Sequence, residues 1–267
     1  MMDPSDPGFW PGLFEVLMVG TGQTLYMVGV ALLLTVIVGL PLGLVLVGTE
    51  PGGLFAKPFG SAALGRWVNR ALDSLVNFGR SVPFIILMVE LIPFTRLIVG
   101  TFIGTTASIV PLTIVAIPFF ARMVEIAIKE VDSGLVEAAE SRGATRWHIV
   151  SQVLVPEALS PMVLGLSTTI TSIISFSAMV GTVSGGGLGD VAVRFGYQRY
   201  NGIHMVAVII LIFVIVMIIQ SFATWLARRF SHGGRTARSG RGGSGKRSAS
   251  TEMTTDADAR VLLSPAN

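Results

Sequence analysis

Four long stretches without a charged residue are the feature that most constrains how this chain can fold. About 20 apolar residues in a helix cross the hydrocarbon core of a bilayer, and each stretch is long enough to do so. They predict membrane spans at about 21–47, 105–121, 161–183 and 203–227. A weaker fifth segment, at about 77–95, carries Arg80 and Glu90. The sequence therefore predicts an all-α membrane protein with five transmembrane helices.

The composition excludes several other classes of protein. Only 13% of the 267 residues are charged and 51% are hydrophobic, whereas soluble domains have about 25% charged residues. Residues 1–230 hold 13 Lys/Arg and 13 Asp/Glu, so the net charge of +3 comes from residues 231–267 alone. The basic character is thus confined to the tail, and we expect a lipid bilayer rather than a nucleic acid as partner. No cysteine is present, which excludes disulfides and thiolate chemistry.

The positions of Lys and Arg predict the orientation, because these residues accumulate on the cytoplasmic side. With the N-terminus outside and the C-terminus inside, 16 of the 19 basic residues lie inside, and only Arg96, Arg194 and Arg199 lie outside. Residues 1–19 are then extracytoplasmic, residues 20–230 form the membrane domain, and residues 231–267 form a disordered basic cytoplasmic tail. Within the tail, Gly240 to Lys246 resembles a P-loop, but it lacks the following Ser or Thr and the flanking strand and helix.

Catalytic and metal-binding motifs are missing from the sequence. Neither H-E-x-x-H nor G-x-S-x-G occurs, and the three histidines fall in separate segments, the inner loop, the outer end of the last span and the tail. We therefore expect no enzyme activity, no metal and no cofactor in this chain. Glu90 is the one acid inside a predicted span, where a carboxylate can serve ion coupling. It fits a position near the wet outer interface equally well.

Two spans carry patterns of small or hydroxyl-bearing residues. The first span contains Gly39 and Gly43 around Pro41, a spacing that permits close helix contact, while the proline can also kink the helix. In the fourth span one helical face holds a set of polar and flexible side chains, broadened by Ser167 and Thr171. The set is Thr168, Ser172, Ser175 and Met179. This face either lines an aqueous pathway or packs against another helix, and one residue could do both at a dimer interface.

The segment between the third and fourth spans has the pattern of two short helices. Ser133 can cap the first helix, and Gly143 can end it in the left-handed conformation. Thr145 can cap the second helix, and Pro156 is expected to stop it before the fourth span. Such a rigid unit below the membrane suits the transmission of force from a soluble partner.

Residues 132–157 resemble the EAA loop of ABC importer permeases, whose pattern is EAA-x3-G-x9-I-x-L-P. The matching residues are Glu137, Ala138, Ala139, Gly143 and Pro156. Val153 and Val155 replace the Ile and the Leu of the pattern, and both keep an apolar side chain. In that family the loop forms coupling helices that dock in a groove of a cytoplasmic ATPase. The resemblance thus implies that these residues belong to an ATPase contact.

Other segments resemble the methionine-importer subgroup of these permeases. They are Arg80–Phe84, Ile92–Arg96, Ile109–Thr113, Pro118–Glu125, Gly185–Gly189, Phe195–Tyr197 and Arg199–Asn201. The resemblance covers about residues 13–230. It implies a type I ABC importer in a bacterial cytoplasmic membrane, made of two copies of this chain, two ATPase subunits that hold ATP and Mg²⁺, and an extracytoplasmic methionine-binding lipoprotein. The permease would carry out no chemical step.

Three alternatives remain open at the level of sequence. The substrate could be another amino acid or a methionine derivative. The chain could be an ion-coupled secondary transporter that uses Glu90, although no internal repeat supports this. It could also be a membrane scaffold that acts through its basic tail.

Overall fold

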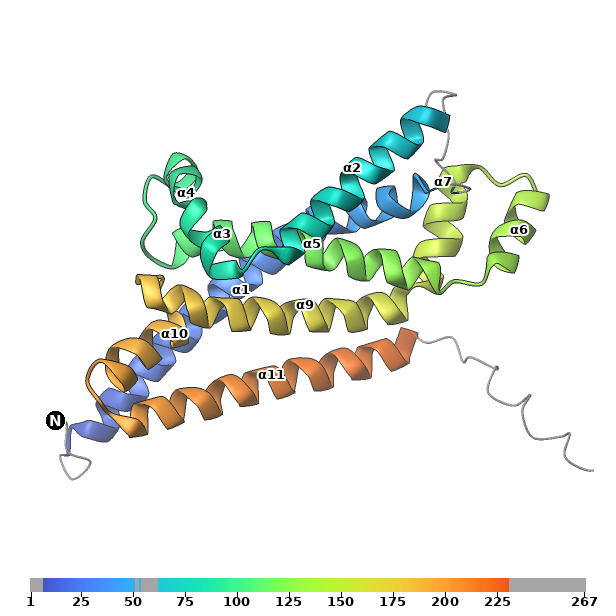
Figure 1. Cartoon of the computed structure of the whole chain (residues 1–267). Coiled ribbons are helices and arrows are strands. Elements are labelled where there is room, and N and C mark those ends of the chain that lie inside the picture. The colour runs from blue at the N-terminus through green and yellow to red at the C-terminus, as the bar shows by residue number, and fades with distance from the viewer. Residues whose placement is uncertain (1–6, 51–52, 54–61, 231–267) are drawn as a thin grey trace, which may run out of the picture. The chain divides into compact units, whose positions relative to one another are not determined.

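The structure is a computed structural model that describes residues 7–50, 53 and 62–230. Every helix named below belongs to the unit of residues 1–230. The described residues form helices and no strands. The predicted tail, including the P-loop-like segment at Gly240, lies outside the described residues. Figure 1 shows the order of the helices along the chain.

Helix α1 runs from Phe9 to Gly48 and makes its most extensive contact with α5, Thr105–Lys129. At 40 residues it is about 60 Å long, twice the thickness of a hydrocarbon core. It begins well before the predicted start at residue 21 and continues through Pro41. Gly39 and Gly43 face α5, where a Cβ on Gly43 would lie 2.6 Å from the Ala121 carbonyl oxygen. The predicted close approach at the glycine pair is therefore confirmed.

The segment 77–95, predicted as the second span, is not one continuous helix. Helix α2, Ala62–Ser81, is followed by α3, Phe84–Glu90, at an angle of 105°. A third helix, α4, extends from Ile92 to Val99. The break falls at Pro83, which has ψ 131° and lacks the N–H that would continue α2. The pair α2–α3 is consequently either one broken span or a re-entrant turn.

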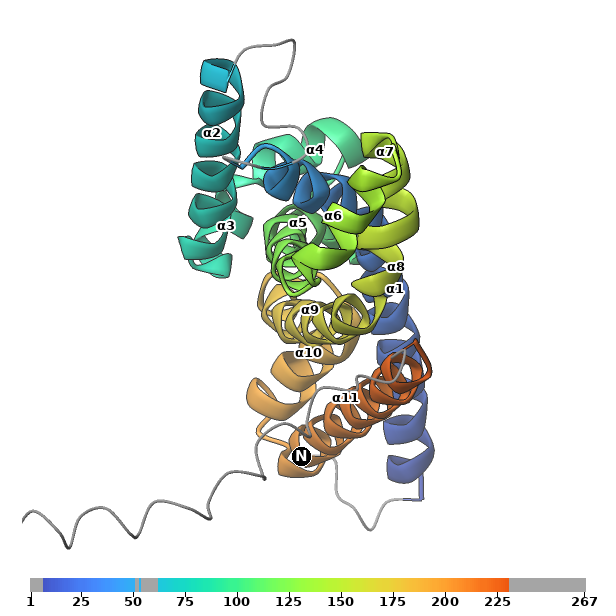
Figure 2. The same cartoon turned by 90° about the vertical axis from the view of Figure 1, so that its right-hand side faces the viewer.

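The C-terminal half of this unit stacks α9 between α5 and α11. Helix α9 runs from Leu159 to Val180 and α11 from Gly202 to Phe230. They are joined by three short elements, a 3-10 turn at Gly181–Val183, helix α10 at Gly187–Val191 and a π-helix at Ala192–Tyr197. Figure 2 shows α5, α9 and α11 in succession with α1 along their side, in agreement with the contacts between these helices.

Helix α1 supplies the caps of the glycine-rich turn before α10. The Gln23 side-chain oxygen accepts from the N–H of Gly187 at 2.8 Å, and the Thr24 hydroxyl accepts from the N–H of Leu188 at 2.8 Å. These bonds satisfy two N–H groups that would otherwise have no partner at the start of a helix. The turn between α9 and α10 is thereby attached to α1.

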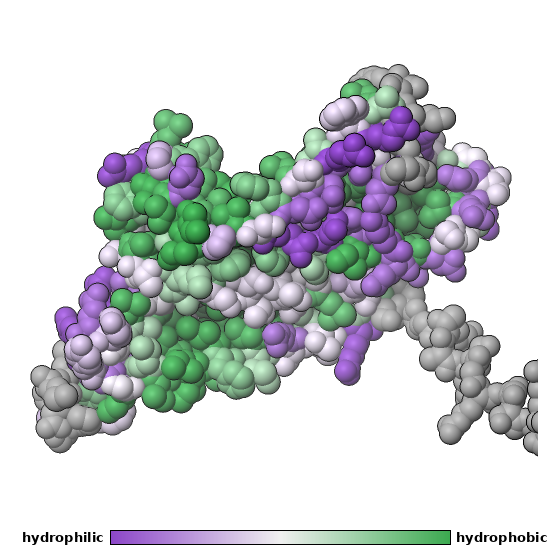
Figure 3. All heavy atoms as spheres, viewed as in Figure 1, coloured by the Kyte–Doolittle hydropathy of each residue, from purple (hydrophilic) through white to green (hydrophobic). Residues whose placement is uncertain are grey.

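Apolar side chains remain exposed along the helices that are long enough to cross a membrane. Four helices pass that test by length and composition among the described residues, or five if the bent pair α2–α3 counts as one span. On α11, Ile209, Phe213 and Ile218 are all more than half exposed. Figure 3 shows apolar surface over α11, while hydrophilic residues gather along α2 and around α6. An apolar exterior of this kind is suited to contact with lipid.

Candidate functional site

The first helix of the loop between α5 and α9 is α6, Ser133–Ser141. Its N-cap is Asp132, whose carboxylate accepts from the N–H of Gly134 at 2.8 Å, so the prediction that Ser133 is the cap is wrong by one residue. Aspartate is as good an N-cap as serine, and its charge also favours the helix N-terminus. The predicted cap Ser133 is instead the first residue of the helix.

Gly143 ends α6 as predicted. Its φ is +76°, its N–H donates to the Glu140 carbonyl at 2.8 Å, and the N–H of Ala144 donates to the Ala139 carbonyl at 3.1 Å. These two bonds form a Schellman motif, which requires the left-handed conformation at the glycine. No other atom lies within 4 Å of the position of a Cβ on Gly143, so the backbone conformation alone selects glycine here.

The second helix of the loop does not end at Pro156. Helix α7, Arg146–Ile149, is capped by Thr145, whose hydroxyl accepts from the N–H of His148 at 3.3 Å, as predicted. It continues as a π-helix at Val150–Leu154 and as α8 at Val155–Glu157, and then joins α9 through Ala158 in helical conformation. In the wider π turn the N–H of Val155 donates to the Val150 carbonyl. The π turn thus occurs where a proline interrupts the regular α-helical bonds.

The second helix of the loop is anchored by buried residues, whereas the first helix is exposed. Ile149 and Val150 are buried, whereas α6 has no buried residue. Of the residues in the EAA motif, Glu137 and Ala138 are exposed and Ala139 is half-buried. Trp147 is 73% exposed and Leu135 is 43% exposed, although both are apolar. Figure 1 shows α6 and α7 at the end of α5 opposite to α3 and α4. The loop therefore leaves polar and apolar side chains exposed at that end of α5.

A chain of ion pairs lies at the base of the loop, and the sequence analysis missed it. Arg122 and Lys129 of α5 flank Glu125, at 2.7 Å and 2.8 Å, and the Glu125 side chain is only 4% exposed. Arg122 also pairs with Asp73 of α2 at 3.2 Å, and Lys129 pairs with Glu50 after α1 at 2.5 Å. The spacing of three and four residues within α5 was the available signal. The pairs tie three helices together directly before the loop.

The four residues of the predicted polar face lie along one side of α9. Thr168, Ser175 and Met179 are exposed and Ser172 is half-buried. Each hydroxyl donates to a carbonyl one turn earlier in the same helix, at 3.0–3.2 Å. The three exposed residues are open either to water or to a second copy of the chain. Ser167, which was expected to broaden the face, is buried.

The remaining titratable candidates do not assemble into a site. Glu90 is exposed at the end of α3, and no ion pair of Glu90 occurs within the described part of the chain. His148 is exposed on α7, while His204 is buried on α11 between the rings of Phe9 and Phe195. Across residues 7–50, 53 and 62–230, no group of three His, Asp or Glu side chains could hold a metal ion.

A helical membrane domain with an exposed loop that matches the EAA pattern is typical of one class of transport protein. The comparison with known protein families identifies this class. Residues 51–232 match the family described as binding-protein-dependent transport system inner membrane component, and the chain belongs to this family. It is accordingly a multi-pass membrane protein that serves as a permease component.

Individual relatives show which members of this family the chain resembles. The chain is 51% identical over 219 residues to the probable D-methionine transport system permease protein MetI of Vibrio cholerae, covering 82% of this chain and 93% of the relative. It is 40% identical to the methionine import system permease protein MetP of Bacillus subtilis, covering 62% and 75%. A solved structure of the MetNI methionine ABC transporter, in an inward-facing conformation, matches with a TM-score of 0.77 at 41% identity, covering 85% and 99%.

Proposed function

We propose that this chain is the permease subunit of an ATP-driven importer that carries methionine across the cytoplasmic membrane of a bacterium. The observation that carries the proposal is the preformed loop of α6 and α7, which presents Glu137 and Ala138 to a partner. Relatives at 40–51% identity are named as methionine or D-methionine permeases, which supports the substrate. Another amino acid or a methionine derivative is the alternative substrate.

In the complete importer two copies of this chain form the pathway, and two ATPase subunits bind the loops from the cytoplasm. ATP and Mg²⁺ are held by those subunits, and an extracytoplasmic lipoprotein delivers the substrate. The bias of Lys and Arg supports an orientation with the N-terminus outside and the loop inside. ATP drives the cycle through its different affinity for two conformations of the complex.

The connection from the loop to the membrane supports a mechanical role for it. The backbone is helical from Arg146 through the π turn and α8 into α9. Displacement of α7 therefore moves α9, because no flexible linker separates them. The face of Thr168, Ser172, Ser175 and Met179 would change its exposure to the pathway as α9 moves. The ion pairs around Glu125 fix the other end of the loop to α5, α2 and the end of α1.

The test is ATP-dependent uptake of labelled L- and D-methionine into proteoliposomes that contain the full complex. Glu137→Lys should reduce both uptake and co-purification of the ATPase, because the substitution reverses the charge on an exposed residue of the contact. Glu130→Lys is the matched control, since Glu130 is exposed just before the loop but lies outside the motif. Normal uptake and co-purification in Glu137→Lys would contradict the role of the loop. Uptake driven by an ion gradient without ATP would favour the secondary transporter.

A further inference from the structure

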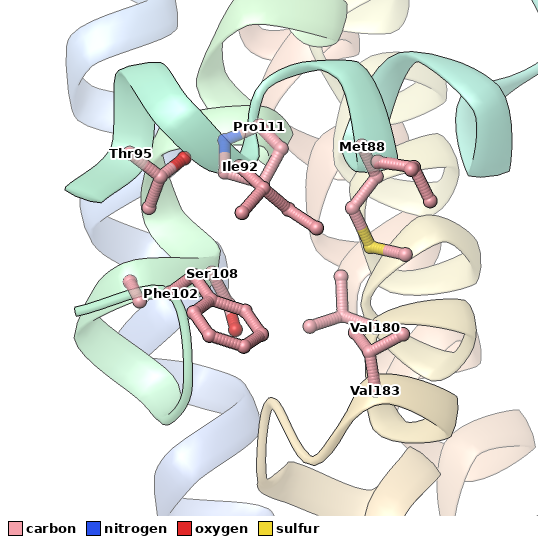
Figure 4. Close-up of a pocket in the computed structure, with 10 residues that line it drawn as sticks. Met88, Ile92, Thr95, Phe102, Ser108, Pro111, Val180 and Val183 are labelled. Atoms are coloured by element: carbon pink, nitrogen blue, oxygen red, sulfur yellow. The ribbon is translucent and has the colours of Figure 1, made fainter.

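A small apolar pocket lies at the end of α5 opposite to the coupling loop. It has a volume of about 60 Å³, and its walls come from α3, α4, the segment before α5, the start of α5, the end of α9 and the 3-10 turn that follows it. Figure 4 shows Met88, Phe102 and Val180 pointing into the same space from three of these segments. None of the residues discussed so far as pathway or loop residues lines it.

The chemistry of the walls favours a soft apolar group. Met88 contributes a thioether and Phe102 an aromatic ring, and sulfur interacts favourably with aromatic rings. The Ser108 hydroxyl is already engaged, because it donates to the Gly104 carbonyl at 2.9 Å and lies 3.3 Å from the Gly185 carbonyl oxygen. An engineered cavity of about 150 Å³ holds benzene. A pocket of less than half that size suits the end of a methionine side chain, a methyl thioether, better than a bulkier side chain.

The positively charged side chain of Arg96 lies next to this pocket. The guanidinium of Arg96 lies 4.7 Å from the centre of the Phe102 ring, and the side chain of Arg96 is exposed. Within the described residues Arg96 forms no ion pair, so its charge is available to an incoming anion. Arginine binds carboxylates through two parallel hydrogen bonds. A ligand that touches Phe102 is therefore within one side-chain length of a carboxylate-binding group.

We propose that this pocket and Arg96 form a binding site for the transported amino acid. The methyl thioether occupies the pocket between Met88 and Phe102, and the α-carboxylate pairs with Arg96. The proposal rests on methionine import as the proposed function and names the residues that would recognise the substrate inside the permease. It assigns substrate selection partly to the permease rather than wholly to the delivering lipoprotein.

The size of the pocket can be tested by exchanging one wall residue. Val183 lines the pocket in the turn after α9, whereas Val206 on α11 is exposed and does not. The assay is uptake of labelled methionine and labelled ethionine, which is one methylene longer, by the full complex in proteoliposomes. One methylene changes selectivity in an apolar site about tenfold or more. Val183→Ala should therefore lower the ratio of methionine to ethionine uptake about tenfold, and Val206→Ala should leave it unchanged.

The role of Arg96 is tested by comparison with a second arginine that lies over an aromatic ring. Arg199 lies 4.7 Å from the centre of the Phe195 ring, the same arrangement at a different place. Arg96→Gln should raise the KM for methionine about tenfold with little change in maximal rate, whereas Arg199→Gln should leave the KM unchanged. The same lipoprotein and ATPase serve every variant, so a change in ratio or KM reports on the permease.

The outcomes separate this inference from the proposed function. If the wild-type complex takes up no methionine with ATP, the proposed function fails. If the wild-type complex takes up methionine but Val183→Ala leaves the ratio unchanged, or Arg96→Gln behaves like Arg199→Gln, the binding site is overturned while methionine import stands.

Discussion

Replacement of Gly143 by valine tests the turn between α6 and α7. No atom lies within 4 Å of the position of the new Cβ, so the cost comes only from holding a β-branched residue at φ +76°. That cost is about 1–2 kcal/mol for an L-residue in the left-handed region. A change of this size lowers an equilibrium constant about 5- to 30-fold. The equilibrium constant for forming the Schellman turn should therefore fall by about this factor.

The assay compares ATP-dependent methionine uptake and co-purification of the ATPase for glycine, alanine, valine and asparagine at this position. Uptake should fall from glycine to alanine and further to valine, following the population of the turn. Asparagine tolerates the left-handed conformation, so Gly143→Asn should stay close to the wild type. Gly100→Val introduces the same kind of strain at the end of α4, where φ is +82° and the surroundings are open. It should leave the ATPase bound.

Equal uptake for asparagine and valine at position 143 would refute this reasoning, since the two differ most in their tolerance of positive φ. Loss of ATPase binding in Gly100→Val as well would show that general destabilisation, rather than the turn, controls the contact.

Three further predictions concern packing, charge and the tail. Gly43→Leu should overpack the contact of α1 with α5 and destabilise the protein by at least about 1–3 kcal/mol, which lowers the melting temperature in detergent. Gly29→Leu should leave the melting temperature unchanged, because nothing lies within 4 Å of a Cβ at Gly29. Glu125→Ala should destabilise the protein by about 1.5–3 kcal/mol, because Arg122 and Lys129 lose a buried charged partner but keep Asp73 and Glu50. Glu50→Ala, at a carboxylate that is 35% exposed, should cost about 1 kcal/mol or less in the same melting assay. Deletion of residues 233–267 should leave methionine uptake near that of the full chain at equal expression, and a large decrease would show that the tail takes part in transport.

Local signals in the sequence were sufficient to predict much of the loop formed by α6 and α7. The roles of Gly143 and Thr145 were predicted correctly, because a turn glycine and a hydroxyl cap depend only on residues a few positions away in the sequence. Ser133 and Asp132 are both good caps and adjacent, so composition could not decide between them. The outcome at Pro156 differs for another reason. A proline removes one helical bond, and a π turn can absorb that loss, which no local pattern distinguishes from a helix end.

Features that depend on distant residues were beyond the sequence. The bend after α2 could be suspected from Pro83, but its angle of 105° depends on how α3 packs against α5. The ion pairs of Glu125 with its neighbours in α5 follow from helical spacing, whereas Asp73 and Glu50 join through tertiary structure. The pocket beside Arg96 is assembled from six separate segments, and no single one of them has a distinctive pattern.

The π turn at Val150–Leu154 also fixes the rotational phase between the loop and the membrane helix. A π turn holds about one residue more than an α turn, and one residue of an α-helix corresponds to a rotation of 100° and a rise of 1.5 Å. The side of α7 that presents Trp147 is therefore offset from the hydroxyl side of α9 by an angle that this one residue sets. Deletion of one residue here would therefore turn α9 by about 100° relative to α7.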